Sequence, residues 1–381
     1  MIGKAYMFNG GARPIDGMIN ETGVEEISML DKCVANFYSL CEQDHELTLG
    51  SQEDPRHAYQ GETISSAMGY NFSKTTGKMC LVSEHGFGGK SYQQLKKGTT
   101  AYNNSIRAVK HAKELCDRYG WNYEVIGVAV VHGEADSEGG TTESTYKNNL
   151  IEWQSNYDED IKAITGQSRT VKLYVSQTGS TSAYRLESSP IPNAVFLASV
   201  QNSNIRFVCP QYAYPFTYAS VHMNNYGYRF LGEFFGNQIA RDFNGSFNNT
   251  LFPTKSSYDD TTKKITIEFN ANQGLEFDIN NIPAVSDDQY GFELIDNSNN
   301  VSITNIAVVN GKVEITLDNT PANGTKISYA YKPTSDEMGK IGYINGIRGN
   351  LRTSNAFQSY FTNQDLPNWC CVFCVNINYN N

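Results

Sequence analysis

Short apolar runs alternate with segments of helical period from residue 78 to about residue 240, and this alternation is the strongest constraint on the fold. The apolar runs have the length of buried strands, and the segments between them place apolar residues three and four positions apart, as one face of a helix requires. Strands that alternate with helices form a parallel sheet covered by helices on both faces. We therefore expect a flavodoxin-like α/β domain of three layers, α/β/α. The expected strands cover residues 78–84, 123–133, 170–178 and 205–210, and the expected helices cover residues 102–120, 145–165 and 224–243. The apolar face of the last helix holds Tyr226, Phe230, Leu231, Phe234 and Phe235, which we expect to be buried.

The period changes after about residue 250, where apolar and polar residues alternate. A period of two predicts strands with one buried face, and Asn310-Gly311 between two such runs predicts a tight hairpin. This part predicts a small antiparallel β-sandwich. Earlier in the chain, residues 23–43 predict a helix. We expect an α/β domain over residues 1–248, a β-sandwich over residues 249–335, and a tail over residues 336–381 that packs back on the first domain.

The charge and the cysteines of the chain argue against several kinds of partner. Lys and Arg number 30 and Asp and Glu number 40, and the resulting net charge of -10 repels a phosphate backbone, so no nucleic-acid partner is expected. No run approaches the ~20 apolar residues that a membrane span requires, so no membrane insertion is expected. The cysteines at positions 370, 371 and 374 lack a histidine or a second cysteine pair at ligand spacing, so no metal site is expected.

Residues 130–136, with the sequence VVHGEAD, end one expected strand with an imidazole and two carboxylates. A carboxylate can orient and polarise an imidazole, and an imidazole can deprotonate a hydroxyl. Another expected strand runs into the glycine-rich segment SEHGFGGKSY at residues 83–92. Active sites on parallel sheets lie at the carboxyl ends of the strands, so the two segments are expected to line one cleft. Asp136 is expected to organise the glycine loop that follows it, and His85 to be an exposed histidine.

The order of several motifs resembles the SGNH hydrolase superfamily. The motifs are HGFGGKSYQQLKKGTTAY, GVAVVHGEAD, AITGQ, VSQTGS and VHMNNYGYRFLGEFFG. They are most similar to sialate O-acetylesterase-like carbohydrate esterases carried by bacteriophages and gut bacteria, whose C-terminal β-domain also has segments like ISYAY, GNLR and NWC. The resemblance implies a three-layer esterase that removes acetyl groups from sugars and uses no metal and no organic cofactor.

The resemblance also implies roles for individual residues. His222, ahead of the last helix, corresponds to the general base, and Glu134 to the acid that orients it. Gly88 or Gly89 would donate one backbone hydrogen bond to the oxyanion. His132 stands where relatives carry a glutamine that donates the other, and a neutral imidazole can donate one hydrogen bond.

The nucleophile of this family is not found where relatives carry it, at the end of the first strand. Relatives carry it in a Gly-Gln-Ser or Gly-Asp-Ser segment that closes the first strand, and residues 1–20 hold no such segment. Either the segment precedes residue 1, or it has been replaced, or the fold has no esterase chemistry. Ala219 stands where many relatives carry an aspartate, which is why the orienting acid is sought at Glu134. The serines that could substitute, none of them on a recognisable nucleophile turn, are Ser65, Ser66, Ser83 and Ser91, of which Ser91 is expected to be a helix N-cap.

Two functions from different classes follow. The first is a carbohydrate O-acetylesterase that acts on O-acetylated polysaccharide or host glycans, as part of a phage fibre or spike. The second is an inactive or incomplete esterase fold that binds glycans or serves as a structural virion component. A lipase or peptidase of the same superfamily is a third alternative, for which no apolar lid is evident. We expect a homo-oligomer or contacts with other virion proteins, and location in the phage particle or otherwise outside the cell.

Overall fold

The computed structural model describes most of the chain after residue 62 together with two short strands before it. In the strands Ala5–Phe8 and Phe37–Ser39 only the backbone is described. The other described residues are 63–83, 85–217, 221–247, 250–271, 274–285, 289–296 and 298–380.

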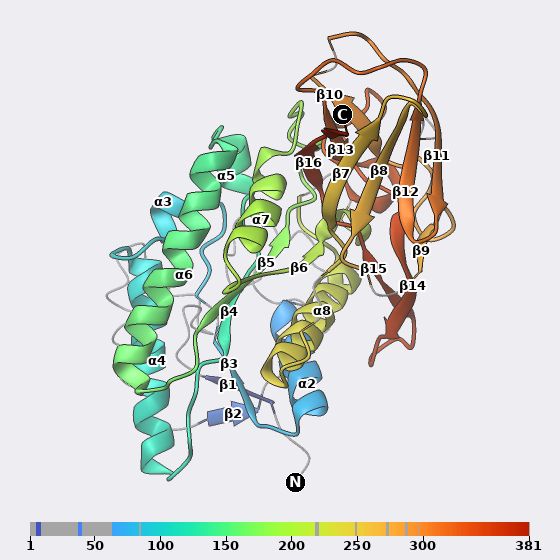
Figure 1. Cartoon of the computed structure of the whole chain (residues 1–381). Coiled ribbons are helices and arrows are strands. Elements are labelled where there is room, and N and C mark those ends of the chain that lie inside the picture. The colour runs from blue at the N-terminus through green and yellow to red at the C-terminus, as the bar shows by residue number, and fades with distance from the viewer. Residues whose placement is uncertain are drawn as a thin grey trace.

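A parallel sheet forms the centre of the first part of the molecule (Figure 1). Strands β4, β5 and β6 lie side by side in that order and run parallel. Strand β1 pairs parallel with β3 and antiparallel with β2. The predicted strands 78–84, 123–133, 170–178 and 205–210 are therefore confirmed in kind and direction. The bounds are β1 Ala5–Phe8, β2 Phe37–Ser39, β3 Cys80–Val82, β4 Gly127–Val130, β5 Lys172–Gln177 and β6 Ile205–Pro210.

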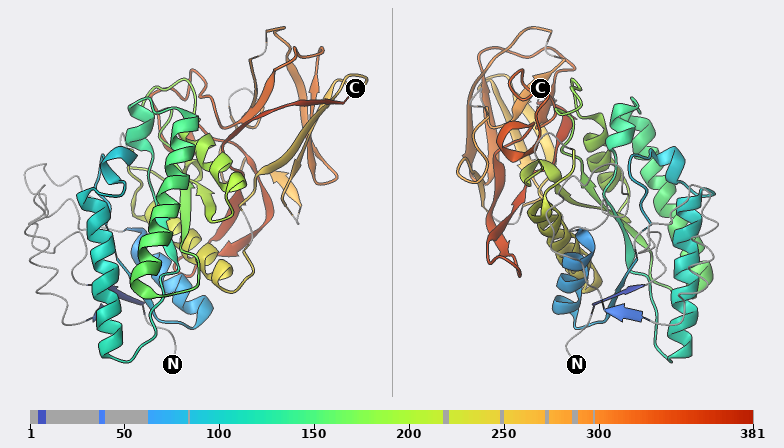
Figure 2. Two further views of the ribbon diagram at one scale, coloured as in Figure 1. Left: turned by 60° about the vertical axis from the view of Figure 1, so that its left-hand side comes forward. Right: turned by 180° about the vertical axis from the view of Figure 1, so that it is seen from behind.

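Helices cover both faces of this sheet, because successive strand residues point to opposite sides. In β5, Leu173 and Val175 belong to the core that α6 and α7 also line, whereas Tyr174 between them belongs to the core that α2 and α8 line. Figure 2 shows these two groups of helices on opposite sides of the strands. The predicted α/β/α order is thus confirmed. The helices are α2 Ile64–Thr76, α3 Tyr92–Leu95, α4 Thr100–Arg118, α5 Glu134–Glu138, α6 Glu143–Thr165, α7 Pro190–Gln201 and α8 Asn225–Phe243.

Two sequence-based predictions for this part are wrong. Tyr226, expected in the buried face of α8, is 50% exposed because it lies in the first turn of the helix, beyond the edge of the core. The helix predicted for residues 23–43 is contradicted at Phe37–Ser39, which form β2 beside β1. The rest of that predicted helix lies outside the described residues.

The second part of the molecule is built from strands that pair antiparallel, as predicted, except for β17, which pairs parallel with β7 (Figure 1). The predicted hairpin at Asn310-Gly311 joins β11 to β12, and both residues have positive φ, 49° and 75°, as a type I′ turn requires. The sheets have the orders β11-β12-β8-β7-β17, β10-β13-β16 and β15-β14-β9. Their strands are β7 Pro253–Asp259, β8 Lys264–Phe269, β9 Leu275–Phe277, β10 Phe292–Ile295, β11 Ile303–Val309, β12 Lys312–Leu317, β13 Lys326–Tyr329, β14 Leu351–Gln358, β15 Asp365–Trp369, β16 Phe373–Asn376 and β17 Asn378–Asn380.

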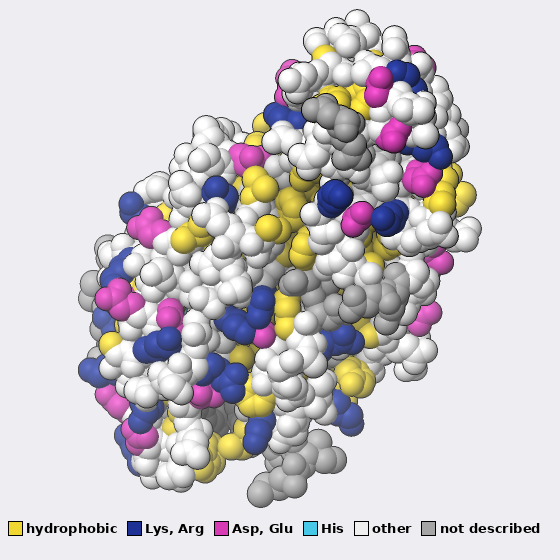
Figure 3. All heavy atoms as spheres, viewed as in Figure 1, with side chains coloured by type: hydrophobic (Ala, Val, Ile, Leu, Met, Phe, Trp, Pro, Cys, Tyr) yellow, Lys and Arg dark blue, Asp and Glu magenta, His cyan; other side chains and the backbone are white. Residues whose placement is uncertain are grey.

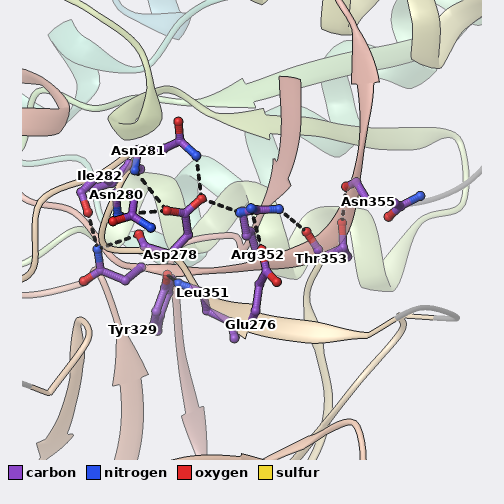
Figure 4. Close-up of polar contacts among 11 residues, drawn as sticks. Glu276, Asp278, Asn280, Asn281, Ile282, Tyr329, Leu351, Arg352, Thr353 and Asn355 are labelled. Atoms are coloured by element: carbon purple, nitrogen blue, oxygen red, sulfur yellow. Dashed lines mark hydrogen bonds and ion pairs between the residues drawn. The ribbon is translucent and has the colours of Figure 1, made fainter. Parts of the chain in front are cut away.

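A group of charges around the buried Asp278 holds β14 against the end of β9 (Figure 4). The carboxylate of Asp278 accepts the backbone amides of Asn280 and Asn281, each at 2.9 Å, and the Nε–H of Arg352 at 2.6 Å. Arg352 also pairs with Glu276. The side-chain amide of Asn281 donates to the carboxylate of Asp278 at 2.6 Å, and together the four hydrogen bonds to this carboxylate offset the cost of burying it. The group therefore fixes the position of β14.

The last described segment connects the two parts. Strand β16 pairs with β13, and β17 runs parallel to β7. Beside them, the side chain of Gln177 at the end of β5 exchanges two 2.8 Å hydrogen bonds with the backbone of Val372. The hydroxyl of Tyr212 donates to the carbonyl of Cys370 at 2.7 Å. The boundaries at residues 248 and 335 stay predictions, and these contacts show only that the segment after 351 touches both parts.

The surface mixes charges of both signs. On the face shown in Figure 3, basic and acidic side chains are interspersed over the helices, and hydrophobic side chains gather where the α/β part meets the β-sheets. Within the described ranges, no helix is long and apolar enough to cross a membrane.

Candidate functional site

The carboxyl ends of β4, β5 and β6 form one edge of the sheet. A Cβ atom on Gly133, after β4, would lie 3.1 Å from Thr178 Cγ2, after β5, and one on Gly179 would lie 3.2 Å from the ring of Phe216, which follows β6. The turn after β4 therefore contacts the turn after β5, which in turn contacts the segment after β6. Gly133 has φ of 133°, and a Cβ atom on it would lie only 2.8 Å from Ile191 Cγ2. A side chain at this position would therefore be strained and would clash. We call these turns the esterase edge, after the resemblance of the sequence motifs.

Glu134 begins α5 directly after Gly133 and is half-buried at this edge. Burial raises the pKa of its carboxyl above the ordinary value of 4.5. Burial and then the charge of Glu134 also raise the pKa of Tyr184, which places the two side chains in the same region of the edge. Burial thus disfavours the ionised form of Glu134, which is the form in which an orienting acid accepts a hydrogen bond from an imidazole.

His222 lies in a short hairpin that precedes α8. The hairpin is closed by a bridge between Phe216 and Met223, and the amide and hydroxyl of Thr217 both donate to the carbonyl of His222, at 2.9 and 3.0 Å. His222 is exposed. Since Phe216 packs against Gly179, the hairpin belongs to the esterase edge. The backbones of Glu134 and His222 thus reach the same edge, while the pairing of their side chains stays a prediction.

His132 is held by protein groups on both ring nitrogens. Its Nε2 lies 3.0 Å from the carbonyl of Lys90 and 3.5 Å from Asp136, and its Nδ1 lies 2.8 Å from the hydroxyl of Tyr146. Burial lowers the pKa of His132 and outweighs the charge of Asp136, which acts to raise it. A neutral ring then donates from Nε2 to Lys90 and accepts the Tyr146 hydroxyl. The predicted donation of His132 to an oxyanion stays a prediction, and the contacts give it a different role, which is to anchor the loop before α3.

Asp136 organises the glycine-rich segments, as predicted. One of its oxygens accepts the backbone amide of Tyr92 at 2.8 Å, and the other accepts the hydroxyl of Thr141 at 3.0 Å. Asp136 is only 2% exposed. It therefore fixes the loop before α3 and the turn after α5 at the same time.

Gly88 and Gly89 stand exposed on the loop that His132 and Asp136 anchor. Gly89 has φ of 67°, and a Cβ atom built on either glycine would meet nothing within 4 Å. In the described residues no acceptor is hydrogen-bonded to either amide. The two N–H groups are accessible to a ligand oxygen, and their predicted role as oxyanion donors stays a prediction.

A serine and a histidine form a pair that sequence reasoning missed. Ser83 Oγ lies 2.8 Å from His85 Nε2, just after β3. His85 is half-buried, so its predicted exposure is wrong, and burial lowers its pKa to about 4. Its Nδ1 is buried without a hydrogen-bond partner in the described structure, so no acid orients the ring. The Ser-x-His spacing was the signal available in the sequence.

The other candidate serines have local roles. Ser91 is the N-cap of α3, as predicted, and forms a capping box with Gln94. Ser65 donates its amide to the side chain of Thr63 at the start of α2. The hydroxyl of Ser66 is buried in the same helix. Within the described residues, no group of three or more His, Cys, Asp or Glu side chains could hold a metal ion.

Comparison with known proteins gives a fold but no family. No family model matches the chain, and no curated protein is related to it in sequence at a significant level. Among solved structures, the chain is similar to a carbohydrate acetylesterase from Xanthomonas citri, with 14% identity and a TM-score of 0.52 over 84% of this chain and 67% of the other. It also matches a protein from Arabidopsis thaliana with 18% identity and a TM-score of 0.36 over 50% of this chain and 68% of the other, which carries no argument here. The chain thus has a fold like that of a carbohydrate esterase.

Proposed function

We propose that this protein is a carbohydrate O-acetylesterase that acts on acetylated glycans. The observation that carries the proposal is the meeting of Glu134, the loop with Gly88 and Gly89, and the hairpin of His222 at one edge of a parallel sheet. The esterase-like fold supports it. The resemblance of the motif order, which runs through the same three segments, supports it independently.

In the proposed reaction His222 takes the proton of a serine hydroxyl while the serine oxygen attacks the acetyl carbonyl carbon. The negative charge on the carbonyl oxygen is stabilised by the amide of Gly88 or Gly89. The bond to the sugar oxygen breaks, and His222 returns the proton to the leaving alcohol. Water then repeats the sequence on the acyl-serine and releases acetate. Glu134 keeps the His222 ring in the orientation that both proton transfers need.

The serine itself is unassigned. Ser83 is the first to test, because its hydroxyl contacts an imidazole beside the glycine loop. A fluorophosphonate that reacts with activated serines, followed by peptide mapping, identifies the nucleophile directly. Labelling of the peptide that carries Ser83, lost in Ser83→Ala and kept in Ser91→Ala, would assign it. Labelling that survives Ser83→Ala would place the nucleophile elsewhere.

The proposed function is tested by acetate release from O-acetylated polysaccharide. His222→Ala should abolish turnover, and Glu134→Gln should lower it by a factor of about 10⁴, since loss of the orienting acid costs about this much in serine hydrolases. Glu138→Gln is the matched control, because this glutamate lies one turn further along α5 and is exposed. Unchanged turnover in both site variants would exclude the proposed mechanism.

A glycan-binding protein without turnover is the second candidate. It is favoured by one observation, that both nitrogens of His132 already contact protein groups. It predicts that the wild-type protein binds acetylated glycan and releases no acetate. Assembly into a phage fibre or spike is proposed from the motif resemblance alone. Light scattering that shows only monomers, together with absence of the protein from purified particles, would reject that part.

A further inference from the structure

A polar pocket lies between α8 and the hairpin of β14 and β15, away from the esterase edge. Asn237, Gln238 and Arg241 line it from the last two turns of α8. Asn355 and Asn368 line it from the two strands of the hairpin. Figure 4 shows Asn355 on the strand that the Asp278–Arg352 pair holds in place. The pocket is therefore lined mainly by α8 and the β14–β15 hairpin, with Leu251, Asn270 and Ala271 completing it.

Two amide oxygens at this pocket lack hydrogen bonds. Gln238 is only 6% exposed, and its Oε1 is buried with no hydrogen-bond partner in the described structure. The Oδ1 atom of Asn368 is also buried and has no hydrogen-bond partner in the described structure. Buried acceptors without donors are rare in folded proteins, because desolvation is not compensated. Since both side chains line the pocket, a ligand hydroxyl bound there can donate to them after a rotation of the amide.

The charge in the pocket has one sign. Arg241 is the charged residue of its described lining, and no carboxylate of the described residues forms an ion pair with its guanidinium. The neighbouring Asp242 points the other way, to Lys172 and Arg206. An arginine among amides provides a planar, bidentate donor for a carboxylate, and the amides provide donors and acceptors for hydroxyls.

We propose that this pocket, the α8–β14 pocket, binds a carboxylate-bearing sugar residue of an acidic glycan. Arg241 pairs with the carboxylate, while Gln238, Asn355 and Asn368 bind hydroxyls. Gln238 is 13 residues along α8 from Asn225 at the esterase edge, a distance of about 20 Å at the rise of an α-helix. The pocket is thus a second glycan site, which holds the polymer at a distance from the esterase edge. The site does not depend on esterase activity.

The test is isothermal titration calorimetry with the full chain and short oligomers of galacturonic, glucuronic and mannuronic acid, each compared with its methyl ester. None of these probes carries an acetyl group, so the outcome is separate from that of the acetate-release test. At least one acid should bind 10-fold or more tightly than its ester. Arg241→Gln should remove this difference, and Arg229→Gln, the same change earlier on α8 and outside the pocket, should keep it. Asn355→Ala, at an exposed position that tolerates substitution, should weaken binding about threefold.

Equal affinity for acids and esters would overturn the role of Arg241. Absence of binding by all three acids, or binding that Arg241→Gln leaves unchanged, would overturn the site. Thermal unfolding of each variant separates lost binding from lost folding, because a cation in the last turn of a helix also stabilises the helix through its dipole.

Discussion

The crossing of α2 and α8 should be destabilised by adding a single methyl group. Gly232 and Gly236 lie one turn apart on α8 and face α2. A Cβ atom on Gly232 would lie 2.5 Å from the carbonyl oxygen of Ile64, and one on Gly236 would lie 2.5 Å from the carbonyl oxygen of Met68. Ordinary contact begins at 3.4 Å, so each alanine would require a shift of 3.4 - 2.5 = 0.9 Å. The atom that must move is helix backbone, which cannot rotate away as a side chain can.

The expected loss in unfolding free energy follows from two opposing effects. Alanine in place of glycine within a helix contributes about 1 kcal/mol of stability. Overpacking costs about 1–3 kcal/mol, and a contact with backbone lies at the upper end of this range. We therefore expect Gly232→Ala and Gly236→Ala each to lower stability by about 2 kcal/mol. The double variant should lose about 3 kcal/mol, less than the sum, because one displacement of α2 relieves both clashes.

Chemical denaturation followed by circular dichroism measures these losses, with Lys74→Ala as an exposed control on α2 that should change stability by less than about 0.5 kcal/mol. If either glycine variant gains about 1 kcal/mol of unfolding free energy, helix propensity alone accounts for the result. That outcome would refute the close approach of the two helices.

Three further predictions concern buried carboxylates. Asp242→Asn should lower stability by about 3 kcal/mol, because it leaves Arg206 without its anion. Burial alone would raise the pKa of Asp242, but its hydrogen bonds, first that of Arg206, outweigh burial and hold the pKa below 3.8. The difference in unfolding free energy between wild type and variant, measured by urea titration, should therefore be constant at neutral pH. It should shrink only as the pH falls below about 4. Burial raises the pKa of Glu233 above 4.5. The wild type should therefore lose stability as the pH rises above 4.5, and Glu233→Gln should not. Chemical denaturation at pH values from about 4 to 7 measures this difference. Asp136→Asn should speed hydrogen exchange at the amide of Tyr92, since a neutral acceptor holds the loop less tightly; unchanged exchange would remove Asp136 from its anchoring role.

Much of the fold could be predicted from the sequence where the local pattern and the tertiary packing agree. β6 is apolar except for Arg206 and forms over the predicted residues 205–210. Asn310 and Gly311 form the predicted turn, because few other residues accept two successive positive φ angles. Helix α7 was not predicted. Its residues Ile191, Ala194 and Val195 are buried among elements on several sides, and a helix that is apolar all round has no amphipathic period to detect.

The candidate site was predicted less completely. The turn with Glu134 and the hairpin of His222 were expected at one edge because strand order dictates where such turns lie. The partners of His132 could not be predicted, because Lys90 contributes a backbone carbonyl and Tyr146 a hydroxyl from the far side of a loop. Neither leaves a signal in residue type. His85, predicted to be exposed, is half-buried and hydrogen-bonded to Ser83, two residues before it.

The hydrogen bonds between Gln177 and Val372 join positions 195 residues apart. During synthesis, the end of β5 leaves the ribosome long before Val372 is made, and at about 5–20 residues per second the delay is tens of seconds at the slow limit and about ten seconds at the fast one. For that interval the Gln177 amide can reach its other partner, the carbonyl of Pro192, but not the backbone of Val372. The nascent protein should therefore acquire its full resistance to proteolysis late, after residue 372 has been released, and pulse-labelled chains arrested before that point should remain sensitive to protease.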